Sequence, residues 1–66
     1  MNAIKEISVF STISTLTVFV YDGYEIIEEF EITHKSDNCY GQVRRFVASM
    51  QDKYIATRIR DEDGIL

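Results

Sequence analysis

The chain of 66 residues has no proline, no tryptophan, a single cysteine and a single histidine. One cysteine cannot close an internal disulfide, so the sequence does not point to an oxidising compartment. No apolar run approaches the roughly 18 residues that a membrane-spanning helix needs. Lys5 and Glu6 interrupt the N-terminal region in which a signal peptide would be apolar. We therefore expect a cytoplasmic protein that does not enter a membrane.

Motifs that would support catalysis or ligand binding are also missing. His34 is the only histidine and has no partner at the spacing that a metal or a catalytic pair needs, so we interpret it as an ordinary strand-end residue. Cys39, near a predicted helix start, could have a reactive thiolate, but its place on an apolar stripe favours packing. We predict that the protein is not an enzyme and holds no cofactor or metal.

Three glutamates, Glu28, Glu29 and Glu31, are the group that comes nearest to a carboxylate site. Side chains alternate along a strand, so Glu28 would point away from the other two. Paired catalytic acids and metal sites also need a cleft and further ligands, which a domain of this size rarely provides. We interpret these residues as a solvated or protein-binding face.

Length and composition predict one small globular domain over residues 1–66. A chain this short buries only about 60% of its unfolded surface, so its core must be small. The content of 45% hydrophobic and 12% aromatic residues is typical of a folded protein. No repeat or linker divides the chain, and the charged end over residues 61–66 is expected to be mobile.

Residues 16–32 predict a β-hairpin that bends at Asp22-Gly23, because glycine takes a positive φ without strain and both flanking runs are rich in β-formers. A two-residue loop, Asp22-Gly23, would place apolar residues of the first strand on a face with three glutamates. A three-residue loop begins one residue earlier, at Tyr21, and gives a better core. Its pairs are Val20 with Tyr24, Val18 with Ile26, Leu16 with Glu28 and Ser14 with Phe30.

The three-residue loop gathers one apolar face, with Glu28 as its single misfit. The residues on that face are Leu16, Val18, Val20, Tyr24, Ile26, Phe30 and Ile32. Burying one such side chain is worth roughly 1.5–3 kcal/mol, so we predict this register.

The remaining segments predict a strand before the hairpin, and a helix and a strand after it. The first strand lies near residues 4–10. Residues 11–14 are only a weak break, so a single long strand with a bulge that continues into the hairpin is an alternative. A helix over residues 38–52, capped by Ser36 or Asp37, is predicted from a stripe at three- and four-residue steps. That stripe is Cys39, Val43, Phe46, Val47 and Met50.

A final strand is expected over residues 54–60, with Ile55 and Ile59 facing inward and Arg58 and Arg60 facing outward. The helix stripe needs an apolar surface to cover, and the hairpin offers one. We therefore predict an α+β fold: a small single-layer antiparallel sheet of three to four strands, in the order β-β-β-α-β, with one helix packed on one face.

The face of the hairpin away from the helix is the most informative part of the sequence. Alternation places acidic residues around two apolar ones there, and we predict a partner-binding face made of Phe19, Tyr21, Glu25, Ile27, Glu29 and Glu31. Residues 1–34 carry one lysine against six acids, a balance of −5, and residues 35–66 carry six basic residues against five acids, a balance of +1. A protein with a basic surface is the partner that this charge favours.

Two other functions remain open on the sequence. The same apolar face, or an edge strand, could close a homodimer with a structural role. The Arg-rich half could instead bind nucleic acid through a basic patch with stacking aromatic residues. The residues of that patch would be Arg44, Arg45, Lys53, Arg58 and Arg60, with Tyr40 and Tyr54.

In size, acidity and strand–strand–helix–strand order, the chain resembles small phage-encoded inhibitors such as anti-CRISPR proteins and phage antitoxins. The resemblance implies a viral protein that acts as an inhibitor or adaptor by binding another protein.

Overall fold

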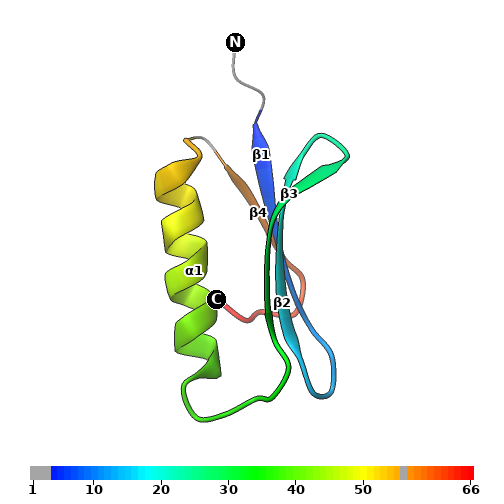
Figure 1. Cartoon of the computed structure of the whole chain (residues 1–66), viewed down its shortest axis with the longest axis vertical. Helices are drawn as coiled ribbons and strands as arrows, with labels where there is room; N and C mark the ends of the chain where they lie inside the picture. The colour runs from blue at the N-terminus through cyan, green and yellow to red at the C-terminus, as the bar shows by residue number, and fades with distance from the viewer. Residues whose placement is uncertain (1–3, 56) are drawn as a thin grey trace.

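The computed structural model describes residues 4–55 and 57–66. Its sheet has four strands in the order β3-β2-β1-β4, and a single helix lies along one face (Figure 1). The elements are β1 (Lys5–Ser11), β2 (Leu16–Asp22), β3 (Glu25–Ile32), α1 (Cys39–Lys53) and β4 (Arg58–Asp61). The predicted α+β class and element order are confirmed, and residues 5–11 form a separate first strand.

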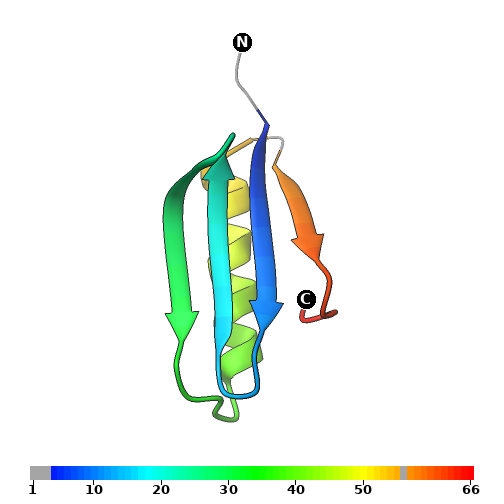
Figure 2. The same ribbon diagram turned by 90° about the vertical axis from the view of Figure 1, so that its right-hand side faces the viewer.

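The sheet is mixed, whereas we predicted that it would be antiparallel throughout. β1 pairs with β2 and β2 with β3 in antiparallel fashion, but β4 runs parallel to β1. The helix is the reason: α1 leads the chain back to the end of the sheet where β1 and β3 begin, so β4 starts from that same end (Figure 2). β3 and β4 are the two edges of the sheet.

The hairpin turn is one residue shorter than we predicted. Asp22 pairs with Glu25, so the loop consists of Gly23 and Tyr24, with Gly23 at φ 66°. Glycine suits this position because a side chain there would be strained. Tyr24, which we expected to face inward, is fully exposed.

A β-bulge then shifts the register between β2 and β3 by one residue. Tyr21 pairs with Ile26 but Val20 pairs with Glu28, so β3 carries one extra residue at Ile27. One extra residue reverses the alternation of the strand that follows. The lower part of β3 therefore turns Phe30 and Ile32 toward the helix, as predicted, while Ile26 stays exposed.

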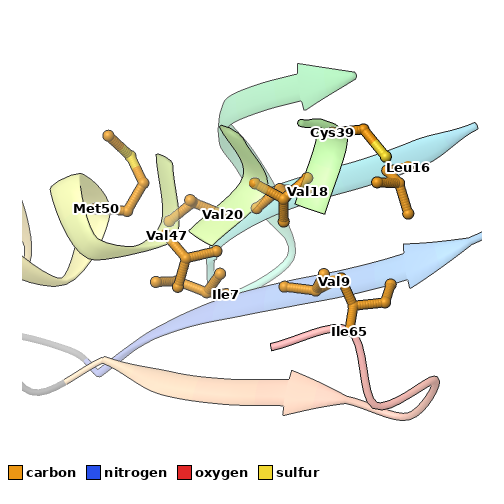
Figure 3. Packing of buried hydrophobic residues seen from close by; sticks show 10 residues of the cluster. Ile7, Val9, Leu16, Val18, Val20, Cys39, Val47, Met50 and Ile65 are labelled. Carbon is orange, nitrogen blue, oxygen red and sulfur yellow. The ribbon is translucent and has the colours of Figure 1, made fainter. Parts of the chain in front are cut away.

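The core lies between α1 and the inner face of the sheet (Figure 3). β2 is central, and Leu16, Val18 and Val20 are fully buried. The stacked rings of Phe30 and Phe46, with centroids 4.7 Å apart, close the core along β3. The buried members are Ile7, Val9, Leu16, Val18, Val20, Cys39, Val43, Val47, Met50 and Ile65. The predicted helix stripe and the packed position of Cys39 are confirmed.

The helix begins without the side-chain cap that we predicted from Ser36 or Asp37. Its first flanking residue is Asn38, whose side chain makes no capping hydrogen bond. The Cys39 N–H donates instead to the backbone carbonyl of Ser36, at 3.2 Å. Among the described residues α1 is the only helix, and it is neither long nor apolar enough to cross a membrane.

The C-terminal segment is packed rather than free, contrary to the mobility expected for residues 61–66. Ile65 inserts into the core, and the Asp61 carboxylate accepts hydrogen bonds from the backbone N–H groups of Ile65 and Leu66, at 2.8 and 2.9 Å. Asp63 accepts a further bond from the Ser11 N–H at 2.9 Å. The final strand is also shorter than predicted, and Ile55, expected to face inward, lies outside it and is exposed.

Two isoleucines provide a matched test of the core. Ile7→Val removes one methylene from a fully buried site and should lower the free energy of unfolding by about 0.5–1.5 kcal/mol. Ile13→Val, at a site that is 99% exposed, should change it by less than about 0.5 kcal/mol. Urea unfolding followed by circular dichroism measures both values. Equal effects would contradict this assignment of the core.

The C-terminal residues allow a similar comparison. Ile65→Ala should lower the free energy of unfolding by about 2 kcal/mol or more, because it leaves a cavity in the core. Leu66→Ala, at a neighbouring exposed site, should stay within about 0.5 kcal/mol of the wild type. A frayed end would instead make the two substitutions equally harmless in urea unfolding.

Candidate functional site

No helix or strand of residues 4–55 and 57–66 packs over the face of the sheet opposite α1, and we call it the helix-free face (Figure 2). The register decides which side chains belong to it, because residues paired across strands share a face. β1 and β2 supply its middle and the two edge strands supply its flanks. Its residues are Glu6, Ser8, Phe10, Thr17, Phe19, Tyr21, Ile26, Glu29, Glu31, Arg58 and Arg60.

Three aromatic side chains form the centre of the helix-free face. The ring centroids of Phe10 and Phe19 are 5.7 Å apart, and those of Phe19 and Tyr21 are 6.1 Å apart in an edge-on arrangement. Such geometry is favourable for aromatic pairs. All three side chains are half-buried although no helix covers them, because they shield one another. We call this group the aromatic cluster.

Charges of opposite sign flank the aromatic cluster. On the β3 side, Glu29 lies opposite Phe19 and Glu31 lies opposite Thr17. On the β4 side, Arg58 and Arg60 lie next to β1. Arg60 is partly neutralised by Glu62, whose Oε1 is 3.7 Å from the arginine Nε. The helix-free face is therefore acidic along β3 and basic along β4, and its middle holds the aromatic cluster together with Glu6 and Ser8 of β1.

A shallow depression of about 300 Å³ opens on the helix-free face near the hairpin turn. Its lining combines one carboxylate, one guanidinium and two phenol rings. The lining residues are Glu6, Ser8, Tyr21, Gly23, Tyr24 and Arg60. The depression is too open to exclude water, so it is suited to contact with a side chain of another molecule rather than to enclosed chemistry.

Four of the six predicted face residues lie where we expected them: Phe19, Tyr21, Glu29 and Glu31. Ile27 does not, because it is the bulge residue and packs against the core. Glu25 is also misplaced, since it pairs with Asp22 and alternation turns that pair away from Tyr21. Sequence reasoning missed Phe10, although its alternation with the buried Val9 would have indicated this face.

The predicted basic patch is divided by the fold. Arg44 and Arg45 are exposed on α1, on one side of the sheet, whereas Arg58 and Arg60 lie on the helix-free face. Lys53 is engaged with Glu28. These residues therefore do not form one continuous cationic surface.

Glu28 lies on the helix side of the sheet, and two residues at the end of α1 satisfy its carboxylate. Lys53 Nζ and Tyr54 Oη lie 2.5 and 2.7 Å from the same carboxylate oxygen, Oε2. The Lys53 Nζ atom also sits 5.3 Å from the centre of the Tyr54 ring. This three-residue cluster ties the end of α1 to β3.

The pKa values in the cluster show what it can do chemically. The hydrogen bond from Lys53, then that from Tyr54, lowers the pKa of Glu28 below its ordinary 4.5. The hydrogen bond to Glu28 raises the pKa of Lys53 above 10.5 and that of Tyr54 above 10.0. All three pKa values move away from neutrality, whereas a general acid or base needs a pKa near the working pH. The cluster is suited to structural stabilisation.

Other candidate chemistry finds no site in the described part of the chain. His34 is exposed, and Cys39 is buried in the core. Residues 4–55 and 57–66 contain no group of three histidine, cysteine or acidic side chains that could hold a metal ion. No protein-family model, no curated protein and no solved structure matches this chain.

The cluster predicts a specific pH dependence of stability. Because the pKa of Glu28 is lowered on folding, its stabilisation is present above pH 4.5 and is lost as the pH falls through the folded-state pKa. The stabilisation that comes from Lys53 and Tyr54, whose pKa values are raised, is lost only at strongly alkaline pH. Glu28→Gln should therefore destabilise the protein at neutral pH and much less at about pH 3.

Urea unfolding at the two pH values measures this effect. Glu31→Gln, which removes one negative charge from the opposite face, is the matched control and should cost less than Glu28→Gln at neutral pH. A cost for Glu28→Gln that is the same at both pH values would show that ionisation of the cluster does not contribute.

Proposed function

We propose that this protein is a non-catalytic interaction module, a small acidic inhibitor or adaptor that binds a basic surface of another protein through its helix-free face. The proposal includes action in the cytoplasm and, from the resemblance to phage-encoded inhibitors, a viral origin. The observation that carries it is the aromatic cluster, which lies uncovered between the acids of β3 and the arginines of β4.

The aromatic cluster supports the proposal because protein interfaces concentrate their binding energy in a few aromatic anchors near the centre. Phe10, Phe19 and Tyr21 are such anchors, and they are already held in place by one another and by the strands. A partner that covers them would therefore restrict little additional side-chain motion, which is a major cost of binding.

The charges on β3 support the choice of a basic partner. Glu29 and Glu31 are exposed next to the aromatic cluster, and the chain carries a net charge of −4. Charges at the rim of an interface accelerate encounter with an oppositely charged surface and discriminate against like-charged ones. The acids at this rim therefore favour a partner rich in lysine or arginine.

Nucleic-acid binding is a second candidate, because Arg58 and Arg60 share the helix-free face with aromatic rings on which bases stack in single-strand binders. Two observations weigh against it. Arg44 and Arg45 lie on the other side of the sheet, and Glu6 and Glu29 stand on the same face as the rings. A polyanion would be repelled by these carboxylates and by the net charge.

Affinity capture from lysate with three baits tests the proposal. The baits are the wild type, the double variant Glu29→Lys/Glu31→Lys, and a control, Glu25→Lys/Asp52→Lys, with the same change of charge at exposed sites off the face. The wild type and the control should capture the same protein. The first variant should capture at least about tenfold less, because the rim charge is reversed.

Circular dichroism must first show that all three baits are folded. Equal capture by both variants would mean that the acids of the helix-free face are not used. Capture of RNA in place of protein, sensitive to salt and lost with Arg58→Glu/Arg60→Glu, would favour the second candidate.

A further inference from the structure

The free edge of β3 is the longest open segment of backbone in the sheet. β3 has 8 residues and pairs with β2 on one side only, while the other edge strand, β4, has 4 residues. Figure 2 shows β3 in green at one border of the sheet, with no strand of the described chain beyond it. Unpaired strand edges of this kind accept an additional strand, because their backbone N–H and C=O groups on that side are available.

The bulge at Ile27 limits where a new strand can dock. Regular pairing of β3 continues from Glu28 to Ile32, so this five-residue stretch is the usable part of the edge. Glu29 and Glu31 project to the helix-free face, while Phe30 and Ile32 project toward the helix and are half-buried. Glu28 also lies on the helix side, but Lys53 and Tyr54 already engage its carboxylate.

A second copy of the chain is a poor occupant of the middle of this edge. In antiparallel pairing of β3 with β3 of a second copy, both helices lie on the same face of the combined sheet. Each residue of β3 is then paired with a residue of the second copy whose side chain points to the same face. Pairing centred on Phe30 sets Glu29 against Glu31 of the second copy. Pairing centred on Glu29 or on Glu31 sets that residue against itself. Like charges directly opposite one another destabilise a strand pair, so each of these registers is disfavoured.

We propose that the β3 edge takes up an extended segment of the partner as a fifth strand, and that this segment alternates basic and apolar residues. The inference rests on the proposed function and adds the mode of binding and the chemistry of the bound segment. Basic side chains would lie beside Glu29 and Glu31, and apolar ones beside Phe30 and Ile32. The added strand would also extend the helix-free face by one strand beyond β3, so that one partner could cover both this edge and the aromatic cluster.

The alternation makes the proposal specific. A strand presents every second residue to one face, so two lysines spaced two apart meet both glutamates, whereas a block of lysines sends half of them to the apolar side. The probe is an eight-residue peptide with blocked ends in which lysine and valine alternate. Its controls are a peptide of the same composition with four lysines followed by four valines, and one in which glutamate replaces lysine.

Titration of the isotope-labelled full chain, followed by NMR, reports both affinity and location. The alternating peptide should bind about tenfold more tightly than the block peptide, because two or three cross-strand charge and apolar pairs are lost in the latter. Its binding should shift the backbone amide signals of residues 28–32 and slow their hydrogen exchange. The glutamate peptide should not bind.

Two variants separate the edge from the face. Glu29→Lys/Glu31→Lys should abolish binding of the alternating peptide, and Glu25→Lys/Asp52→Lys should leave it unchanged. Phe19→Ala/Tyr21→Ala, which removes two rings of the aromatic cluster but keeps the edge, should retain binding of the peptide while capture of the whole partner from lysate is lost.

Three results would overturn the proposal. Equal affinity for the alternating and block peptides, with shifts centred on Phe10, Phe19 and Tyr21, would leave the proposed function standing but remove the edge as the binding mode. No response at residues 28–32 to either peptide would also remove it, while lysate capture would still test the face. A dimeric mass, with β3 amides already protected before peptide is added, would show that a second copy occupies the edge.

Discussion

A single helix has to cover the apolar side of a four-stranded sheet, and the rest of the structure follows from that constraint. One helix can bury one face only, so the strands direct most of their aliphatic residues to the same side. β2 does so with Leu16, Val18 and Val20, and β1 with Ile7 and Val9. In the part of the chain that the structure describes, the other face has no covering layer, and its aromatic residues shield one another. The uncovered face is thus a direct result of a sheet that has one helix beside it in the described residues.

The sequence was sufficient for features that depend on periodicity. The helix stripe, the facing of β2 and the inward turn of Phe30 and Ile32 were predicted correctly because each repeats over several residues and buries much apolar area. The bulge could not be predicted in this way. We explained the inward facing of Phe30 and Ile32 by a three-residue loop. In the structure it results from a two-residue turn together with one extra residue in β3, at Ile27. Both solutions give the same facing beyond the bulge, so periodicity alone does not distinguish them.

The candidate site was predicted only in part for the same reason. Residues after the bulge, such as Glu29 and Glu31, lie on the predicted face, and Glu25, before it, does not. Phe10 was not assigned to the face, although its alternation with Val9 indicated an outward side chain. Arg58 and Arg60 were predicted to face outward, but placing them on the same face as the aromatic cluster requires knowing which strands are neighbours. That β4 would lie beside β1, and parallel to it, is a long-range outcome that local patterns do not encode. Burial of Ile65 was missed likewise, since the strand residues of the core that it joins, such as Val9, are distant in sequence.

The pairing of β4 with β1 also has a consequence for the order of folding. β1, β2 and β3 are joined by short turns and can assemble early, but β4 must close a loop that spans most of the chain, as does the bond from Ser11 to Asp63, 52 residues apart. Loop closure over such a distance slows folding, because its entropy cost comes before the contacts that compensate for it. During synthesis β4 emerges last, so until then β1 is itself an uncovered edge. The growing chain therefore exposes two strand edges, and the finished protein has replaced one of them with a short strand bearing Arg58 and Arg60.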